Sequence, residues 1–441
     1  MYDAVVIGAG PGGYVCAIRA AQLGGKVCLI EKNGLGGTCT QRGCIPTKFL
    51  HSAGDILRKA RNAKRNGIDA QLTLDYKLMR ERMQSTVKKL ASGIKLLLES
   101  NNIDLIEGQG CIISKDSVSV GAKIMDTKNI VIATGSYPIC LPGYEFNETI
   151  LSTDTILELN ELPRSILVVG GGYSGCEFAS ILNALGVKVT LIEAEDHLMP
   201  LQVQEIGDTI EKYMRLDGTD VRTGAKLEKI EGNAAIVDGE RIESDKILVS
   251  IGRKPNINKE ELTKLGISFN EQGVLVDEEM RTSIENIFAI GDVTGKYELA
   301  HVASKQAEVA AQNIMEVKSK IDYRVVPACI FTYPEVAFVG ELAGRSGDFP
   351  LTASAKANCL GETRGFIKVF EKDGIIVGAM IIAAHAGEMI GEAALAIKMR
   401  LKIEDVIDTI HAHPTLPESF AEALRELSNE AIHLPAKKSS K

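Results

Sequence analysis

Two cysteines, Cys39 and Cys44, lie downstream of a glycine-rich loop, and their spacing can support redox chemistry. On an ideal helix, two residues five positions apart have Cα atoms about 8–9 Å from each other. A disulfide requires a Cα separation of roughly 4.4–6.8 Å. A bond between these cysteines therefore requires the backbone to leave ideal helix geometry, and Gly43 would ease that change. An accessible pair next to a nucleotide-binding fold indicates a redox function.

The alternatives are two unpaired thiols or half of a zinc site. A zinc site would need a second cysteine pair or a histidine cluster at ligand spacing, and the sequence contains neither. We therefore favour the redox pair and expect no metal site. The nine cysteines are odd in number and scattered, which is not typical of a secreted disulfide framework.

Charge and hydropathy exclude several classes of protein. The net charge of −8 disfavours nucleic-acid binding. No apolar run approaches the ~18 residues of a membrane span. Because a predicted strand begins within the first residues, we expect no targeting segment and a cytoplasmic location.

The chain contains the same nucleotide-binding pattern twice. Each copy has an apolar strand, a Gly-x-Gly-x-x-Gly loop, an amphipathic helix and a second strand that ends in glutamate. The glutamate lies 18 positions after the third glycine in both copies, Gly13 to Glu31 and Gly175 to Glu193. In such loops the first glycine makes a tight turn, the second admits a pyrophosphate and the third lets helix and strand pack. Two complete patterns predict two dinucleotide sites.

The two glutamates also indicate which nucleotides bind. A carboxylate at this position accepts hydrogen bonds from a ribose 2′-hydroxyl and repels a 2′-phosphate. The residues that follow Glu193 include no arginine to bind a phosphate. The second copy is therefore predicted to prefer NAD over NADP.

Hydrophobic periodicity predicts a helix over about 75–98 and strands within 129–136, 246–255 and 286–293. The sequence therefore predicts an α/β fold with two doubly wound nucleotide-binding domains and an α+β C-terminal domain. Asp292, at the end of the last of these strands, would bind a cofactor hydroxyl or only mark a turn.

His413 is the residue best suited to activate a thiol. A thiol with an ordinary pKa near 8.5 needs a base to react quickly at pH 7. Pro414 disfavours helical geometry at His413, so we expect the ring on a loop or bend. A structural role in a turn is the alternative, but Glu418 nearby favours a base. His301, His385 and His411 are expected to be structural or peripheral.

These motifs together resemble the flavin-dependent pyridine nucleotide–disulfide oxidoreductases, over nearly the whole chain. The resemblance rests on both glycine loops, the cysteine segment 36–48, and the stretches 133–136, 290–292 and 411–418. It implies tightly bound, non-covalent FAD in the first unit, NAD⁺ or NADH in the second, and a C-terminal domain that forms a homodimer. The implied boundaries are 1–145 for the first part of the FAD domain, 146–265 for the NAD domain, 266–322 for a central segment completing the FAD site, and 323–441 for the interface domain.

The resemblance also implies residue roles. Cys44 would be the thiol next to the flavin and Cys39 the outer thiol that exchanges with substrate. His413 would be the general base, held by Glu418 and reaching the cysteines of the partner subunit.

Further roles concern the cofactors. Lys48, one helical turn after Cys44, would lie near the flavin and pair with Glu177. Tyr173 stands where some relatives use an aromatic ring to cover the flavin. The implied FAD contacts are Gly8, Gly10, Gly13, Glu31, Gly37, Thr38, Lys48, Gly110, Ala133, Thr134, Gly135, Asp292 and Ala300. The implied NAD contacts are Gly170, Gly172, Tyr173, Gly175, Glu193 and Gly252.

The implied reaction oxidises a dihydrolipoyl group with NAD⁺, on a lipoyl-carrying protein of a 2-oxo-acid dehydrogenase or glycine cleavage system. A glutathione-type reductase is disfavoured, because Ile18 stands where those enzymes carry an arginine. A mercuric-type reductase is disfavoured because the C-terminus lacks adjacent cysteines. A non-catalytic flavin-binding assembly subunit is disfavoured by the intact cysteines and the His413–Glu418 pair.

Three further expectations concern single segments. The chain is shorter than usual in the family between 340 and 349, and Arg42 adds a cation near the thiols that could lower their pKa. The apolar faces of 393–397 and 416–427 are expected to supply a two-fold interface. The polar, basic tail 435–441 is expected to be disordered.

Overall fold

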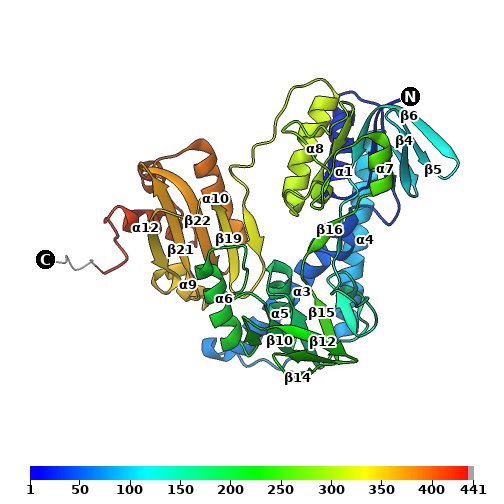
Figure 1. The fold of residues 1–441 in the computed structure, drawn as a ribbon. Helices are drawn as coiled ribbons and strands as arrows, with labels where there is room; N and C mark the ends of the chain where they lie inside the picture. Colours follow the sequence, from blue (N-terminus) through cyan, green and yellow to red (C-terminus); the bar gives the residue numbers. More distant parts are fainter. Residues whose placement is uncertain (436–441) are drawn as a thin grey trace. The chain divides into compact units, whose positions relative to one another are not determined.

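A computed structural model describes residues 1–435 of the chain, and the predicted tail falls almost entirely outside them. The chain divides into two compact units (Figure 1). One comprises Met1–Pro163 and Leu248–Asp322, and the other comprises Arg164–Ile247 and the residues from Tyr323 onward. Each combines sheets with helices, which confirms the predicted α/β class.

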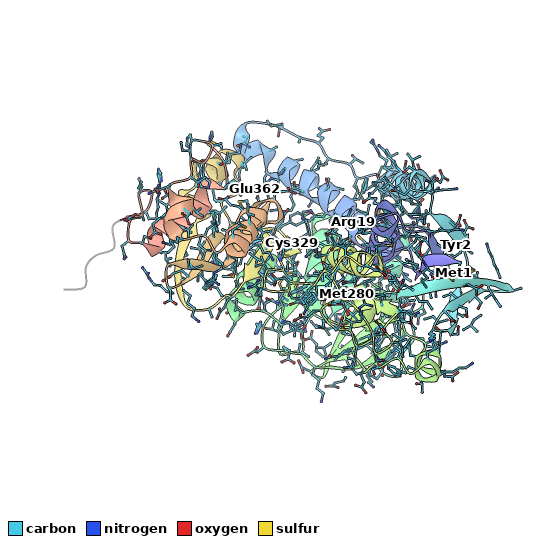
Figure 2. The ribbon with its side chains drawn as sticks, turned by 90° about the horizontal axis from the view of Figure 1, so that it is seen from above. Met1, Tyr2, Arg19, Met280, Cys329 and Glu362 are labelled. Atoms are coloured by element: carbon cyan, nitrogen blue, oxygen red, sulfur yellow. The ribbon has the colours of Figure 1, made fainter. Side chains whose placement is uncertain are left out.

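The first unit is built on a parallel sheet whose central strand is β1 (Tyr2–Ile7). The sheet has the order β3-β2-β1-β6, with β17 paired to β6. These strands are β2 (Val27–Glu31), β3 (Asp104–Glu107), β6 (Lys123–Ile132) and β17 (Ile287–Ala289). The strands around β1 are buried apolar runs, as parallel strands covered on both faces must be. Tyr2, labelled in Figure 2, donates its hydroxyl to Asp104 at 2.8 Å.

Helices α1 (Pro11–Gln22) and α8 (Ala300–Ile314) pack against each other in this unit. Their buried residues are mostly small, which allows the helix axes to approach closely. The other helices of the unit are α2 (Gly37–Arg42), α3 (Cys44–Asn62), α4 (Tyr76–Ser100) and α7 (Lys259–Leu265), with the 3₁₀ turns η1 (Ala63–Asn66), η2 (Thr155–Glu158) and η3 (Gly291–Thr294). The other strands are β4 (Gly110–Ser114), β5 (Ser117–Val120), β7 (Ser136–Pro138), β8 (Ile150–Ser152) and β16 (Arg253–Pro255).

The second unit repeats the strand–helix–strand arrangement. Strand β9 (Ser165–Val169) pairs in parallel with β10 (Lys188–Ile192), and β10 pairs in parallel with β11 (Asp220–Arg222). Helix α5 (Tyr173–Ala184) connects β9 to β10, and α6 (Gln204–Leu216) precedes β11. A small antiparallel sheet follows, made of β12 (Leu227–Glu231), β13 (Ala234–Val237) and β14 (Glu240–Glu243). Strand β15 (Lys246–Val249) then runs to the boundary between the units.

The C-terminal part of the second unit is an antiparallel sheet with the order β18-β19-β22-β21-β20. Its strands are β18 (Ala328–Ile330), β19 (Glu335–Gly340), β20 (Arg345–Pro350), β21 (Phe366–Lys372) and β22 (Ile375–Ala383). Its helices are α9 (Ala355–Leu360), α10 (Ala386–Met399), α11 (Ile403–Ile407) and α12 (Glu418–Leu427), with the 3₁₀ turn η4 (Leu351–Ala353). Only the four residues 341–344 connect β19 to β20 in the segment predicted to be short.

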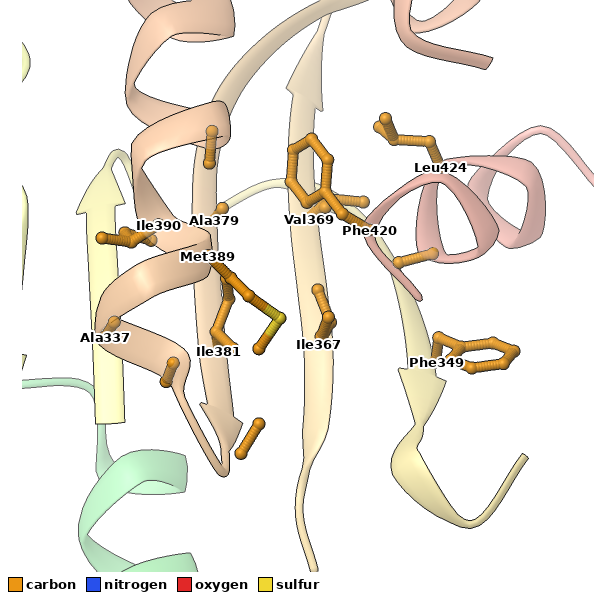
Figure 3. Close-up of a cluster of buried hydrophobic side chains, with 14 of the residues drawn as sticks. Ala337, Phe349, Ile367, Val369, Ala379, Ile381, Met389, Ile390, Phe420 and Leu424 are labelled. Carbon is orange, nitrogen blue, oxygen red and sulfur yellow. The ribbon is translucent and has the colours of Figure 1, made fainter. Parts of the chain in front are cut away.

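Helices α10 and α12 bury their apolar faces against this sheet (Figure 3). Met389 of α10 and Phe420 of α12 lie in one core cluster with Ile367 and Ile381 of the strands. The prediction that the apolar face of 416–427 forms the dimer interface is therefore wrong, because that face fills the core of its own subunit. The large apolar side chains that the described C-terminal part exposes are Leu360, Leu395, Met399, Ile410 and Ile432.

Among the described residues, no helix combines the length and apolar character required to cross a membrane.

Candidate active site

The first glycines of the two loops have the same conformation. Gly8 and Gly170 both have φ = 103°, a region that favours glycine. The Gly8 amide donates to Ile30 at 2.8 Å, and the Gly170 amide donates to Ile192 at 2.9 Å. A Cβ at Gly8 would lie 2.3 Å from the carbonyl oxygen of Ala133. Each first glycine thus makes the tight turn from strand to helix that the pattern predicts.

The second glycines leave open space where a pyrophosphate would approach. A Cβ at Gly10 or Gly172 would meet none of the described atoms within 4 Å. Neither α1 nor α5, which begin at the next residue, has a side-chain cap at its N-terminus. The amide groups and the positive dipole end of each helix therefore face this space. Both loops fit a dinucleotide pyrophosphate.

The two glutamates lie next to the loops they follow. The Ala9 amide donates to Glu31 Oε2 at 2.7 Å, and the Gly171 amide donates to Glu193 Oε2 at 2.6 Å. Each carboxylate is thereby held beside its glycine loop, where it would meet the ribose of a bound nucleotide.

Most of the predicted flavin contacts lie at the carboxyl edge of the first sheet. Residues 133–135 follow β6, and Asp292 follows β17 within η3. A Cβ at Gly110 would lie 3.0 Å from the side chain of Ile7, at the end of β1. Ala300 is the first residue of α8. Because parallel strands end at one edge, residues 133–135 and Asp292 lie at the same edge of the sheet as the glycine loop that follows β1.

The redox segment consists of two helices separated at Gly43, as the spacing of the cysteines predicts. Helix α2 ends at Arg42 and α3 begins at Cys44, with Gly43 at φ = −142° and ψ = −111°. A Cβ at Gly43 would lie 2.9 Å from the carbonyl oxygen of Thr38, so a side chain would not fit there. The break brings Cys39 and Cys44 close together as two thiols with a hydrogen bond between their side chains.

The Cys39 thiol has a pKa above its ordinary value. The largest cause is the hydrogen bond with the Cys44 side chain, followed by burial of Cys39. The cation of Lys48 and the backbone amide of Cys44 act in the opposite direction. Because the two thiols are coupled, removal of the first proton makes removal of the second harder.

Helix α2 lies directly against the first glycine loop. Gly37 has φ = 55°, and a Cβ there would lie 2.6 Å from the Cα of Gly10. The Gly36 amide donates to the carbonyl of Ala9 at 2.8 Å. The cysteine pair is therefore positioned by the same loop that fits a pyrophosphate.

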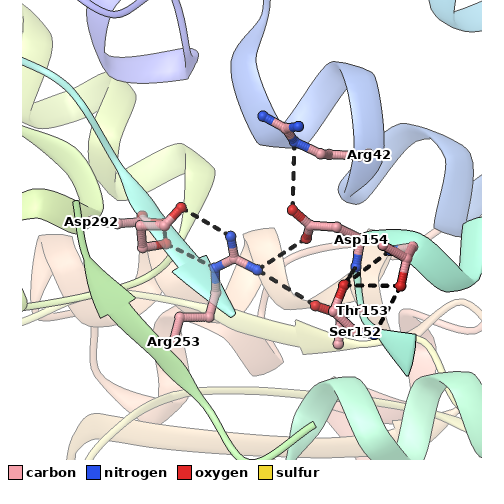
Figure 4. Close-up of polar contacts among 8 residues, drawn as sticks. Arg42, Ser152, Thr153, Asp154, Arg253 and Asp292 are labelled. Atoms are coloured by element: carbon pink, nitrogen blue, oxygen red, sulfur yellow. Dashed lines mark hydrogen bonds and ion pairs between the residues drawn. The ribbon is translucent and has the colours of Figure 1, made fainter. Parts of the chain in front are cut away.

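Arg42, a cation close to the two thiols in the sequence, lies against a carboxylate. The cation that lowers the Cys39 pKa is Lys48, and Arg42 is not among the groups that shift it. Instead, Arg42 Nε lies 3.5 Å from Asp154 Oδ2 (Figure 4). The guanidinium is thus directed at a carboxylate rather than at the thiols.

Arg253 belongs to the same polar cluster and was missed by sequence reasoning. Its Nη1 lies 3.3 Å from Asp154 Oδ1 (Figure 4). Its Nε donates to Ser136 Oγ at 2.8 Å. The Ser136 hydroxyl donates to Asp292 at 2.6 Å. The only feature of the sequence that pointed to Arg253 was its position directly after Gly252. No feature of the sequence pointed to Asp154.

His413 lies on a bend, as predicted, and Glu418 holds it. His413 Nδ1 is 2.9 Å from Glu418 Oε1, and the Thr415 amide donates to Glu418 Oε2 at 2.7 Å. Burial raises the pKa of Glu418, but these hydrogen bonds outweigh it and leave the pKa below its usual range. The His413 side chain is 70% exposed, so its other nitrogen is accessible to a reacting thiol.

In the second unit, Tyr173 and Glu177 both lie on α5. Gln202 donates to the Tyr173 hydroxyl, and burial raises the pKa of Tyr173 to about 12. The Phe331 amide donates to Glu177 at 2.9 Å. Lys48 belongs to the other unit, so its pairing with Glu177 stays a prediction.

Two dinucleotide loops and a dithiol placed against one of them define a class of protein, the nucleotide-dependent disulfide oxidoreductases. Comparisons with known proteins narrow this class. Residues 2–307 match the family model described as pyridine nucleotide-disulphide oxidoreductase, and residues 326–424 match the dimerisation domain of that family. The chain belongs to this family, and it is an NAD-dependent flavoprotein disulfide oxidoreductase.

Similar proteins extend along the full chain. The chain is 40% identical to a dihydrolipoyl dehydrogenase of Chlamydia pneumoniae, with 99% of each chain covered. It is 39% identical to a dihydrolipoyl dehydrogenase of Geobacillus stearothermophilus, with 99% of this chain and 98% of the relative covered. The crystal structure of LpdA from Mycobacterium tuberculosis matches with a TM-score of 0.90 at 28% identity, covering 96% of this chain and 99% of that chain.

Proposed function

We propose that the protein oxidises protein-bound dihydrolipoyl groups with NAD⁺. The observation that carries the proposal is the helix break at Gly43, which joins Cys39 and Cys44 in a hydrogen bond beside the first glycine loop. The relatives named dihydrolipoyl dehydrogenase support the choice of substrate. When bound, the flavin accepts two electrons from the cysteine pair and passes them to NAD⁺ as a hydride.

The two cysteines have different roles in this proposal. Cys44 is the first residue of α3, where the positive end of the helix stabilises a thiolate. We assign Cys44 to the side of the flavin and Cys39 to exchange with the substrate dithiol. In the oxidised form Cys39 and Cys44 are joined by a disulfide. One substrate thiolate attacks Cys39, which breaks this S–S bond, forms a mixed disulfide and releases Cys44 as thiolate. The second substrate thiolate then attacks the substrate sulfur of that mixed disulfide, which releases Cys39 and leaves the lipoyl group as a disulfide.

His413 accepts the protons of the substrate thiols in this scheme. Glu418 Oε1 accepts a hydrogen bond from His413 Nδ1, which leaves Nε2 with a lone pair for a proton. A base of this kind raises the fraction of substrate thiolate at neutral pH. In our proposal His413 serves the cysteines of the partner subunit in a homodimer, whose exposed apolar residues include Leu395 and Met399.

The cofactor contacts follow from the loop geometry. We propose that the first loop and the carboxyl edge of its sheet bind FAD, and that the loop around Gly172 binds NAD⁺ with Glu193 at the ribose. We retain the domain boundaries 1–145, 146–265, 266–322 and 323–441. The partner would be a lipoyl-carrying protein of a 2-oxo-acid dehydrogenase or glycine cleavage system, and the proposed location is the cytoplasm.

Steady-state kinetics test this function. The flavin-loaded protein should reduce NAD⁺ with dihydrolipoamide and show no comparable rate with reduced glutathione. A protein that turned over glutathione as fast as dihydrolipoamide would be a reductase of another substrate class. A protein without visible flavin absorbance, or with none that changes on addition of NADH, would be a binding subunit instead.

A further inference from the structure

A second histidine–carboxylate pair lies two residues before His413. His411 Nε2 is 2.8 Å from Glu392 Oε1 of α10, and His411 Nδ1 is 3.0 Å from the carbonyl oxygen of Thr409. The His411 side chain is 11% exposed, whereas that of His413 is 70% exposed. The nearly buried ring therefore joins the loop that carries His413 to α10.

Both partners of the His411 ring are hydrogen-bond acceptors. A carbonyl oxygen can only accept, and an ionised carboxylate can only accept. A neutral imidazole has one N–H group, so one of its two contacts would bring two acceptors together. The imidazolium form donates to both oxygens and forms a charge-assisted bond with Glu392. The geometry thus favours a ring that carries two protons.

The positive charge of such a ring acts on Glu418. Burial raises the pKa of Glu418, whereas the hydrogen bonds from Thr415 and His413 and the charge of His413 lower it, and His411 adds a smaller effect that also lowers it. Glu418 is the residue that orients His413. Negative and positive side chains therefore alternate from Glu392 through His411 to Glu418. A protonated His413 continues this alternation.

Other charged groups surround this loop. Those on the helices around it are Glu388, Glu392 and Lys398 of α10, Glu404 and Asp405 of α11 with Asp408 after it, and Glu418, Glu422, Arg425 and Glu426 of α12. The Lys402 amide donates a hydrogen bond to Asp405, and Arg425 donates one to the carbonyl oxygen of Ile407. Of these groups, Glu392 is the one at 2.8 Å from the ring.

We propose that His411, kept as an imidazolium by Glu392 and the Thr409 carbonyl, is a positioning residue that keeps the Glu418 carboxylate ionised and so maintains His413 as the base. The proposal rests on the proposed function, in which His413 receives thiol protons. His411 itself touches neither substrate nor cofactor in this account.

The first test is the protonation state of the ring. Nitrogen-15 NMR of the flavin-loaded dimer, labelled at histidine, reports whether each imidazole nitrogen carries a proton. The His411 signals, assigned by their absence in His411→Asn, should show both nitrogens protonated at pH 7. A ring with one bare nitrogen at pH 7 overturns the proposal. This measurement needs no substrate, so it stands even if dihydrolipoamide proves not to be the substrate.

The second test is the pH profile of kcat/KM with dihydrolipoamide. His411→Asn removes a positive charge next to the Glu418–His413 pair, so the pair binds its protons more tightly. The acid limb should therefore move to higher pH by about 0.5–1 unit, a three- to tenfold loss of rate on that limb. Glu392→Gln keeps a hydrogen-bond acceptor but removes the charge that favours the imidazolium, so it should shift the limb in the same direction by less.

The chain offers a matched control. His433 Nδ1 lies 3.2 Å from Glu422, but the His433 side chain is 65% exposed. His433→Asn should leave the pH profile unchanged. If His411→Asn and Glu392→Gln lower kcat at all pH values without moving the acid limb, His411 only supports the fold and the proposal is wrong.

Discussion

The two glycine loops share one geometry but have different neighbours. Gly10 and Gly172 have backbone angles that agree within a few degrees, φ = −67° and −69°, ψ = −178° and −172°. Each loop is bound by its own glutamate through one short hydrogen bond. The difference lies beside the loops. The first is covered by Gly37 of the cysteine helix, whereas the helix after the second begins with Tyr173.

The same glycine loop therefore occurs in two different sites, one with redox chemistry and one with nucleotide binding alone. Both loops fit a pyrophosphate, because that requires only a glycine turn and a helix N-terminus. Redox chemistry is confined to the loop that also supports α2. In the second loop the residue after Gly172 is Tyr173, whose hydroxyl accepts a hydrogen bond from Gln202, where the first loop has Pro11. The following predictions test this division, in order of decreasing effect.

The largest effect is expected from the cysteines. Cys39→Ser and Cys44→Ser should each abolish oxidation of dihydrolipoamide, because neither single thiol can form the exchangeable disulfide. Cys39→Ser should keep a long-wavelength absorption band of the flavoprotein, and Cys44→Ser should lose it. Reduction of a dye by NADH should persist in both. If the band were lost in Cys39→Ser and kept in Cys44→Ser, our assignment of the two thiols would be reversed.

A matched pair of alanine substitutions separates the two loops. Gly10→Ala and Gly172→Ala have backbone angles that alanine accepts and place a methyl group in open space, so neither should unfold the apoprotein. Gly10→Ala should lose bound FAD. Gly172→Ala should keep FAD and raise the KM for NADH at least tenfold, or about 1.4 kcal/mol. Equal effects of the two substitutions on FAD content would contradict the assignment of one nucleotide to each loop.

The preference for NADH over NADPH tests the role of Glu193. NADPH should be a poorer substrate than NADH by at least tenfold in kcat/KM, roughly 1.4 kcal/mol, because the buried carboxylate repels a 2′-phosphate. Glu193→Gln should reduce this ratio. Equal kcat/KM values for NADH and NADPH with the unaltered protein would contradict the role assigned to Glu193.

The smallest effect is expected from the polar cluster beside the first loop. Asp154→Asn leaves Arg42 and Arg253 without their shared carboxylate and should lower the free energy of unfolding by about 0.5–1 kcal/mol in urea. The change in kcat, expressed as a free energy, should be smaller than the change in the free energy of unfolding. Glu278→Gln breaks the exposed pair with Lys320 and serves as the control, with an expected change of about 0–0.5 kcal/mol. An equal loss in both variants would mean that the cluster adds nothing to the fold.

Local features of the site were predictable from the sequence. The glycine turns, the glutamates after the second strands and the break at Gly43 depend on residues close in the chain, where steric rules decide the backbone. The bend at His413 follows in the same way from Pro414. The geometry of each of these features could therefore be predicted from the local sequence alone.

Contacts between distant segments were not predictable. Asp154 and Arg253 are brought together only by folding, and the Glu392–His411 contact connects α10 to the loop before α12. Hydrophobic periodicity showed that 416–427 has an apolar face, but not that the sheet of its own subunit covers it. A pattern in one segment does not specify its partner.

The most direct test of the central claim is a count of accessible thiols at Cys39 and Cys44. In the air-oxidised, flavin-loaded protein, mass spectrometry after iodoacetamide treatment should find both cysteines protected and linked to each other. After anaerobic addition of one equivalent of dihydrolipoamide it should find them alkylated, while reduced glutathione should leave them protected. The exposed Cys111 and Cys359 should react in every sample and serve as internal controls. Alkylation of Cys39 and Cys44 that does not depend on dihydrolipoamide would contradict the account.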